Sequence, residues 1–375
     1  MQSLALAWLV YRLTGSTILM GAVGFVTHIP VLLLGPLAGL VCDRTSRRGV
    51  VIAAQSLFLV QASLLAWLTL SGRISVAHIL SLALLLGVAN AFDIPGRQSL
   101  YIHMVGKEDL ANAIALNSMS FNAARVAGPS IGGLLVALFG EGVCFAVNAV
   151  SYLAVIGSLL AMRHAEPERA APSESPLRHL AEGFRYAWRH RRVRALLIVT
   201  ALANIAMTPA SVLGPVFADQ VFHRGSQGLG LLTGALGFGA VAGTLVLARQ
   251  ARPDLLPRIV LSSAGLGALA LALYALSPSF YVSLAAQLLA GYAIFRLLAS
   301  VNSLIQASID DAFRGRIMSL YSMTVVGMLP LGNLAAGLGG RFLGIRPTVL
   351  AGAMLSLGAA VVWSRLLRAG ELDHS

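Results

Sequence analysis

Charged residues are scarce in this 375-residue chain, at 11% of the total, and Lys107 is the single lysine. A mean hydropathy of +0.80 and a 57% share of hydrophobic residues exclude a soluble globular domain of this length. The net charge of +12 is almost entirely arginine, and the arginines lie in short segments between apolar runs. This placement indicates membrane topology rather than nucleic-acid binding, so we expect a lipid bilayer and no nucleic acid as partner.

Cysteines and catalytic motifs are also scarce. Cys42 ends one apolar run and Cys144 begins another. The topology inferred below puts them on opposite faces of the bilayer, about 30 Å apart, so we expect no disulfide. The sequence has no Walker loop, no Cys/His metal spacing and no Gly-x-Ser-x-Gly. We therefore expect no catalytic residue, no metal and no cofactor, and a chain that is not an enzyme.

Eleven apolar runs are long enough to cross the hydrocarbon core, which takes about 20 residues. They cover 18–42, 50–70, 76–96, 113–139, 143–162, 194–217, 228–249, 257–276, 280–300, 316–340 and 346–366. Residues 2–11 form a shorter twelfth run without the basic start or cleavage site of a signal peptide. We interpret it as a truncated helix 1, and expect the functional reading frame to begin upstream.

Arginines concentrate in alternate connections, above all at 44–48, 163–194, 249–258 and 314–316, and the intervening connections carry few. By the positive-inside rule the basic connections face the cytoplasm. We thus expect an all-α, multi-pass protein of the cytoplasmic (inner) membrane whose C-terminus lies in the cytoplasm.

The two halves repeat with a constant offset that relates Gly87 to Gly291 and Gly133 to Gly337. Parallel repeats of this kind predict two six-helix bundles, one in residues 1–163 and one in residues 193–375.

A basic linker, 164–192, connects the halves. Within it Leu177, Leu180, Phe184 and Trp188 recur at helical spacing, which predicts an amphipathic helix on the membrane surface.

The connection between the first two complete runs carries a distinctive motif. It reads Gly39-Leu-Val-Cys-Asp43-Arg44-Thr-Ser-Arg47-Arg48. This resembles Gly-x-x-x-Asp-Arg-x-Gly-Arg-Arg, the loop 2–3 signature of major facilitator superfamily transporters, with Ser46 where glycine is usual. The resemblance implies the major facilitator fold and a gating role for the motif, in which Asp43 caps a helix or pairs with an arginine. The alternative is an ordinary basic loop.

Asp93 and Arg97 stand four residues apart at the end of the run 76–96. They share one helix face, so they can pair with each other or with loop 2–3. An ionisable residue in a membrane span is a functional candidate. We place both with the gate, and a structural ion pair is the equal alternative.

Gly128-Pro129-Ser-Ile-Gly132-Gly133 lies within the run 113–139. It resembles the end of the Gly-Pro-x-x-Gly-Gly motif of facilitator antiporters, with Ala124 in place of the upstream glycine. Proline permits a bend, and the glycines permit close helix contact. The resemblance implies outward transport.

The segments 93–117 and 302–330 extend the likeness to the branch that holds the enterobactin exporter and macrolide-efflux permeases. This resemblance implies a monomeric secondary transporter. It implies export of a small amphipathic molecule, siderophore or drug-like, by alternating access, with proton antiport as the expected coupling. A non-transporting membrane scaffold or a polytopic membrane enzyme is the alternative.

In the facilitator fold, helices 1, 4, 7 and 10 line the substrate cavity. The polar candidates for that cavity are Asn90, Asn204, Gln287 and Arg296. Arg125, in helix 5, is a further candidate. Each can instead make an inter-helix hydrogen bond worth less than about 2 kcal/mol. The few acids in the spans, Asp93 and Asp219, leave the coupling ion open. The scarcity of acids in the spans, together with the presence of Arg125 and Arg296, predicts a neutral or anionic substrate.

Overall fold

The computed structural model describes residues 1–104, 110–162, 176–250, 252 and 254–368, and the side chain of Asp43 lies outside the described part. Every regular element in these residues is helical, as expected for an all-α fold. The elements are α1 (Gln2–Thr14), α2 (Thr17–Arg44), α3 (Arg47–Leu70), α4 (Val76–Met104), α5 (Leu110–Ala161), α6 (Pro176–Arg189), α7 (Arg191–Val212), α8 (Gly214–Val216), the π-helical turn η1 (Phe217–Val221), α9 (Gly225–Gln250), α10 (Leu256–Leu276), α11 (Phe280–Ala307), α12 (Asp311–Phe342) and α13 (Ile345–Arg368).

Ten helices among the described residues are long and apolar enough to cross a membrane. One of them, the 40-residue stretch Asn122–Ala161 of α5, covers most of two predicted spans, 113–139 and 143–162. It turns at Gly140, whose φ of 82° is a conformation that glycine adopts without steric cost. Counting its two limbs separately, the eleven predicted complete spans are all helical.

Several helices run beyond the predicted apolar limits. The run 76–96 is part of α4, which continues to Met104, and the run 280–300 is part of α11, which continues to Ala307. Hydropathy detects only the part of a helix that matches the hydrocarbon core, so polar extensions escape it. Asp93 therefore lies inside α4, about three turns before its end, and not at a helix terminus as predicted.

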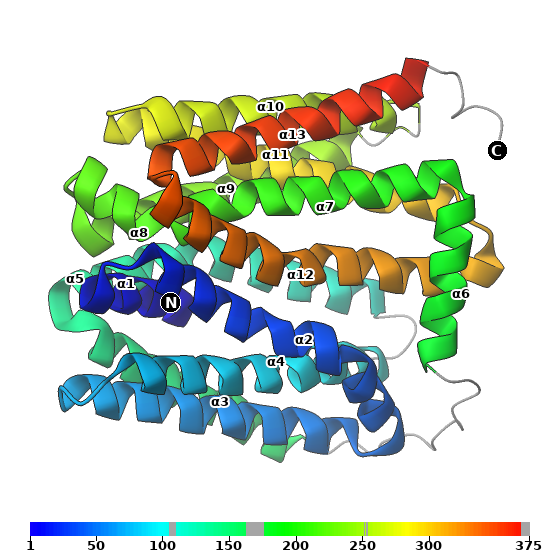
Figure 1. The fold of residues 1–375 in the computed structure, drawn as a ribbon. Helices are drawn as coiled ribbons and strands as arrows, with labels where there is room; N and C mark the ends of the chain where they lie inside the picture. The colour runs from blue at the N-terminus through cyan, green and yellow to red at the C-terminus, as the bar shows by residue number, and fades with distance from the viewer. Residues whose placement is uncertain (105–109, 163–175, 251, 253, 369–375) are drawn as a thin grey trace.

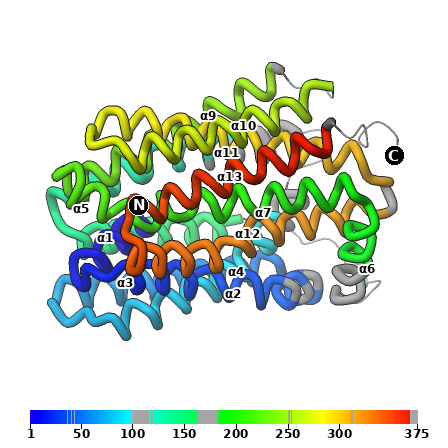
Figure 2. Tube along the Cα trace, turned by 45° about the horizontal axis from the view of Figure 1, so that its top comes forward, coloured from blue at the N-terminus to red at the C-terminus, as the bar shows by residue number. Residues whose placement is uncertain are grey.

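The helices form two bundles that lie side by side (Figures 1 and 2). One bundle contains α1 to α5 and the other contains α7 to α13. Figure 1 shows α6 running across one end of the molecule, nearly perpendicular to the long helices. We call this the Arg-rich end, because it carries the basic segments at 44–48, 249–258 and 314–316. The opposite end, which holds Gly140 and η1, is the Arg-poor end.

One pair of equivalent glycines makes an equivalent helix contact in the two bundles. A Cβ on Gly87 of α4 would overlap the backbone oxygen of Thr27 in α2. A Cβ on Gly291 of α11 would overlap the backbone oxygen of Leu236 in α9. For this glycine pair the predicted repeat corresponds to the same two helices in each half. It does not extend to Gly39 and Gly243, because a Cβ on Gly39 would have nothing within 4 Å whereas one on Gly243 would overlap the backbone oxygen of Tyr292 in α11.

Two glycine crossings join the bundles near the Arg-poor end. Where α5 meets α9, a Cβ on Gly133 would lie 2.7 Å from the Cα of Gly230. Where α2 meets α12, a Cβ on Gly21 would lie 2.8 Å from the Cα of Gly337. Thr17 adds a hydrogen bond across the second crossing, from its Oγ1 to the backbone oxygen of Gly337 at 3.0 Å. Small residues allow helix backbones to approach this closely in a membrane.

The contact between α2 and α12 does not continue to the Arg-rich end. Gly35 and Gly39 lie on the same stripe of α2 as Gly21 and Gly24, because their spacing follows the helical repeat. A Cβ on Gly24 would meet the side chain of Asn333 in α12, whereas a Cβ on Gly35 or Gly39 would have nothing within 4 Å. The two helices therefore diverge toward the Arg-rich end, as Figure 1 also shows.

The linker contains a helix, α6, where the sequence predicts an amphipathic helix, and the side chains of Leu177 and Leu180 lie outside the described part. Gly183 and Ala187 are buried on the side that packs against α12, and Glu182 pairs with Arg316 of that helix at 3.1 Å. Phe184 and Trp188 stack on each other on the exposed side. This arrangement leaves an aromatic face free for the membrane surface.

The glycine crossings generate a stability prediction. Gly230→Ala should lower the melting temperature of the purified protein, since the new methyl would lie 2.9 Å from backbone atoms of both Gly133 and Pro129. Overpacking of this kind typically costs about 1–3 kcal/mol. Gly358→Ala is the matched control, because it makes the same change in a helix at a position with nothing within 4 Å. Equal melting temperatures for the two variants would contradict the close crossing.

Candidate functional site

A cavity of about 910 Å³ lies between the two bundles. Its walls come from α1 to α5 on one side and from α7 to α12 on the other. Three of the predicted cavity residues line it, namely Asn90, Arg125 and Gln287. A space of this size, enclosed by membrane-spanning helices, is large enough for a drug-sized ligand.

The other two predicted cavity residues lie outside this lining. Asn204 is buried within α7, where its side-chain amide donates to the backbone oxygen of Thr200 at 2.9 Å. Arg296 lines a separate pocket on α11. Spacing along a helix does not define the absolute rotation of that helix, so sequence reasoning could not distinguish these positions from Gln287.

Two arginines line the cavity, Arg97 and Arg125, and none of its described lining residues is acidic. The charge of Arg97 is balanced by Asp93, which lies 3.1 Å from it. The guanidinium carbon of Arg125 lies 4.1 Å from the ring centre of Phe295, so α5 of one bundle contacts α11 of the other at this point. The Asn90 amide donates to the backbone oxygen of Leu86 at 2.9 Å, and its oxygen is left to accept from a ligand.

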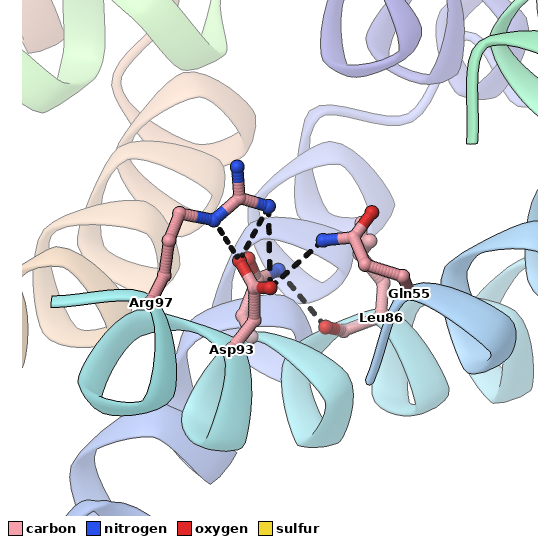
Figure 3. Close-up of polar contacts among 5 residues, drawn as sticks. Gln55, Leu86, Asp93 and Arg97 are labelled. Atoms are coloured by element: carbon pink, nitrogen blue, oxygen red, sulfur yellow. Dashed lines mark hydrogen bonds and ion pairs between the residues drawn. The ribbon is translucent and has the colours of Figure 1, made fainter. Parts of the chain in front are cut away.

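Asp93 is held by several donors next to the cavity (Figure 3). The Nε of Arg97 donates to Oδ2 at 3.2 Å, and a terminal nitrogen of the same guanidinium donates to Oδ1 at 3.2 Å. From α3, Nε2 of Gln55 donates to Oδ1 at 2.8 Å. Asp93 is 8% exposed, so this carboxylate and its partners tie α3 to α4 inside one bundle. The expected pairing with Arg97 is confirmed, and Gln55 is a partner that sequence reasoning missed although an amide in an apolar run is a signal.

Two polar contacts close the Arg-poor end. The hydroxyl of Tyr11 in α1 donates to Oδ2 of Asp219 in η1 at 2.6 Å, which links the two bundles. Arg12 pairs with Glu141 at 2.7 Å, and Glu141 is 6% exposed. Sequence reasoning missed Glu141. A usable signal was present, because Glu141 is an acid next to Gly140 in a connection predicted to lie on the same side of the membrane as Arg12.

The loop 2–3 motif forms a capped helix junction. α2 ends at Arg44 and α3 begins at Arg47, and the hydroxyl of Ser46 accepts a hydrogen bond from the backbone N–H of Gly49 at 3.0 Å. Ser46 therefore supplies an N-cap for α3, which is a physical reason for serine at a position where the family usually has glycine.

The basic residues of this motif have different surroundings. Arg48 donates to the backbone oxygen of Leu160, near the end of α5, at 2.9 Å. Arg44 is exposed and Arg47 is half-buried. The gate assignment of Asp43 concerns a side chain outside the described residues, and a Cβ on Gly39 would have nothing within 4 Å.

The predicted antiporter motif occupies two faces of α5. Gly128 and Gly132 face the start of α1, where a Cβ on Gly132 would lie 3.0 Å from the Cα of Met1. Gly133 faces α9 in the crossing described above, and the backbone oxygen of Pro129 faces Gly230 of α9. The motif thus lets α5 pack closely against a helix of each bundle.

The chain matches the family model described as transmembrane secretion effector over residues 1–374. It is 27% identical over 387 residues to the multidrug efflux pump Tap of Mycolicibacterium fortuitum, covering 98% of this chain and 92% of that protein. It is 26% identical to the staphyloferrin A transporter of Staphylococcus aureus, covering 88% and 83%. It is 31% identical over 246 residues to the enterobactin exporter EntS of Escherichia coli, covering 62% and 56%.

Solved transporters share the fold. The nucleoside transporter NupG superposes with a TM-score of 0.75 at 14% identity, covering 98% of this chain and 96% of that one. A bacterial homologue of the human lysosomal transporter Spinster, in an inward-facing and occupied conformation, gives 0.77 at 14% identity, covering 98% and 92%.

Proposed function

The chain belongs to the transmembrane secretion effector family of the major facilitator superfamily, and from this membership we propose that it exports a small amphipathic molecule that is neutral or anionic. The cavity carries this proposal, because Arg125 lines it and none of its described lining residues is acidic, while Arg97 is paired with Asp93 next to it. Guanidinium groups attract carboxylates and other anions and oppose cations. The names of the relatives, an efflux pump and an enterobactin exporter, support outward transport of a siderophore or drug-like compound.

Alternating access is the proposed mechanism. The bundles touch at the Arg-poor end and diverge at the Arg-rich end, where Gly35 and Gly39 have no neighbour within 4 Å. The basic connections lie on the cytoplasmic side of the inner membrane, so substrate enters from the cytoplasm in this conformation. In the opposite conformation α12 closes onto the glycine stripe of α2, and Asp43 holds this closed state through a helix terminus or an arginine.

Proton antiport is the proposed coupling, with Asp219 as the proton carrier. Protonating Asp93 or Glu141 would forfeit an ion pair with Arg97 or Arg12. Asp219 instead accepts from the neutral hydroxyl of Tyr11, across the contact that joins the bundles. A proton arriving from outside at this acid would weaken that contact and favour opening to the outside. One chain encloses its own cavity, so a monomer suffices for this cycle.

Substrate charge gives the direct test of this function. Inside-out vesicles with an imposed proton gradient should accumulate anionic and neutral amphipathic compounds from a panel of siderophores, macrolides and dyes. Arg125→Gln should slow transport of the anions about tenfold, since one lost charge contact of about 1.4 kcal/mol corresponds to that factor, and should spare neutral compounds. Arg341→Gln, an exposed arginine outside the cavity, is the control. Transport of polycations alone would contradict the charge argument, and no transport of any compound would favour the scaffold or enzyme alternative.

Proton coupling is tested by matched acid variants. Asp219→Asn should abolish the dependence of export on the proton gradient while the protein stays folded in the membrane. Asp93→Asn makes the same chemical change at an acid paired with arginine, and should lower the melting temperature but keep the proton dependence. The measurement is initial export rate against imposed pH difference. Unchanged proton dependence in Asp219→Asn would remove this residue from the coupling.

Cross-linking tests the alternating gates. Gly21 lies against Gly337 and Gly24 against Asn333, and extending this antiparallel register puts Ser319 opposite Gly39. In a Cys42→Ser, Cys144→Ser background, the pair Thr17→Cys and Gly340→Cys should form a disulfide readily, because a Cβ on Gly340 would lie 3.0 Å from that of Thr17.

The pair Gly39→Cys and Ser319→Cys should cross-link only when a proton gradient and substrate drive the cycle. Either disulfide should stop export until it is reduced. Adding Asp43→Asn should lower the yield of the second cross-link. A high yield of both disulfides without gradient or substrate would contradict exclusive opening to one side at a time.

A further inference from the structure

A second pocket, of about 540 Å³, lies at the Arg-rich end of the C-terminal bundle, apart from the central cavity. Four arginines from three helices and a turn converge on it. They are Arg249 of α9, Arg252 of the connecting turn, Arg258 of α10 and Arg296 of α11. Leu255 and Ile259 supply an apolar wall. The central cavity shares none of these lining residues.

The charges of this pocket are not balanced within the described part of the chain. None of its four arginines makes an ion pair with a described carboxylate, although Asp254 lies in the same turn. The Nε of Arg296 is buried and has no hydrogen-bond partner, and its guanidinium carbon lies 5.6 Å from the ring centre of Tyr292. Buried donors are rarely left unpaired, so the pocket suits an acceptor that the described part of the chain does not provide.

A phosphate group fits this set of donors. A planar guanidinium group can donate two hydrogen bonds to the oxygens of a phosphate, and several converging guanidinium groups can bind one phosphate together. The pocket lies where membrane-spanning helices end, which is the level of lipid headgroups. Leu245 lies one turn before Arg249 on the same face of α9 and is 59% exposed, so an acyl chain can follow the helix from the pocket into the hydrocarbon.

From these observations we propose that the pocket formed by Arg249, Arg252, Arg258 and Arg296 binds the phosphate headgroup of an anionic phospholipid. The bound lipid bridges α9, α10 and α11 and supplies the acceptor for Arg296. It thereby stabilises the Arg-rich end of the C-terminal bundle, where like charges otherwise repel one another.

The test uses the full chain, purified and delipidated in a neutral detergent. Phosphatidylglycerol should raise the melting temperature and give lipid adducts in native mass spectrometry, and phosphatidylcholine should do neither. The triple variant Arg249→Gln, Arg258→Gln, Arg296→Gln should bind phosphatidylglycerol at least tenfold more weakly. The matched control replaces three exposed arginines outside the pocket, Arg341→Gln, Arg346→Gln and Arg365→Gln, and should bind as the parent does.

Arg258→Gln alone changes an exposed side chain and covers the case in which the triple variant does not fold. It should weaken phosphatidylglycerol binding while elution on gel filtration stays unchanged. Inorganic phosphate at millimolar concentration is a separate arm. If phosphate alone reproduces the stabilisation, the ligand is a free phosphate and the lipid assignment is wrong. Equal phosphatidylglycerol binding by parent and pocket variants would overturn the site itself.

Discussion

The close backbone approach at two glycine crossings is the constraint on which the rest of this structure depends. Gly133 against Gly230 and Gly21 against Gly337 bring the bundles together near the Arg-poor end. Lipid tails are as apolar as the helix surfaces, so burial of apolar area cannot join the bundles, and close packing of small residues does. Because the two contacts lie at one end, the space between the bundles widens toward the other and leaves the central cavity.

The polar contacts within the N-terminal bundle are stronger than those that join the two bundles. The multiple donors around Asp93 and the pair of Arg12 with Glu141 both lie within the N-terminal bundle. Contacts between the bundles include single hydrogen bonds, such as Tyr11 to Asp219, glycine crossings, and the contact of the Arg125 guanidinium with the ring of Phe295. In each of the two ion pairs the carboxylate is buried and the arginine is partly exposed, so breaking the pair leaves a buried charge without its partner. By contrast, one hydrogen bond in a membrane protein averages below about 1 kcal/mol. Such an arrangement favours motion of two rigid bodies against each other over deformation inside either one.

Much of the fold could be predicted because it is a local property of the chain. The eleven spans, the amphipathic α6 and the repeat follow from apolar length, helical spacing and a constant offset, and each is present as a helix or an equivalent contact. The pairing of Asp93 with Arg97 follows from their i, i+4 spacing. The missed residues, Gln55 and Glu141, act through partners 38 and 129 positions away, and no local pattern identifies such partners.

Two arginines, Arg125 and Arg296, show which properties the sequence determines by itself and which depend on the tertiary structure. The sequence determined that Arg125 and Arg296 each lie within a membrane-spanning helix, since the flanking residues are apolar. Only the tertiary structure decided that Arg125 faces the central cavity and Arg296 a separate arginine pocket. The reason is rotational: hydropathy determines where along a helix a residue lies, whereas the direction of its side chain depends on how the helix is turned against its neighbours. Here Gly291 sets that turn by holding α11 against α9.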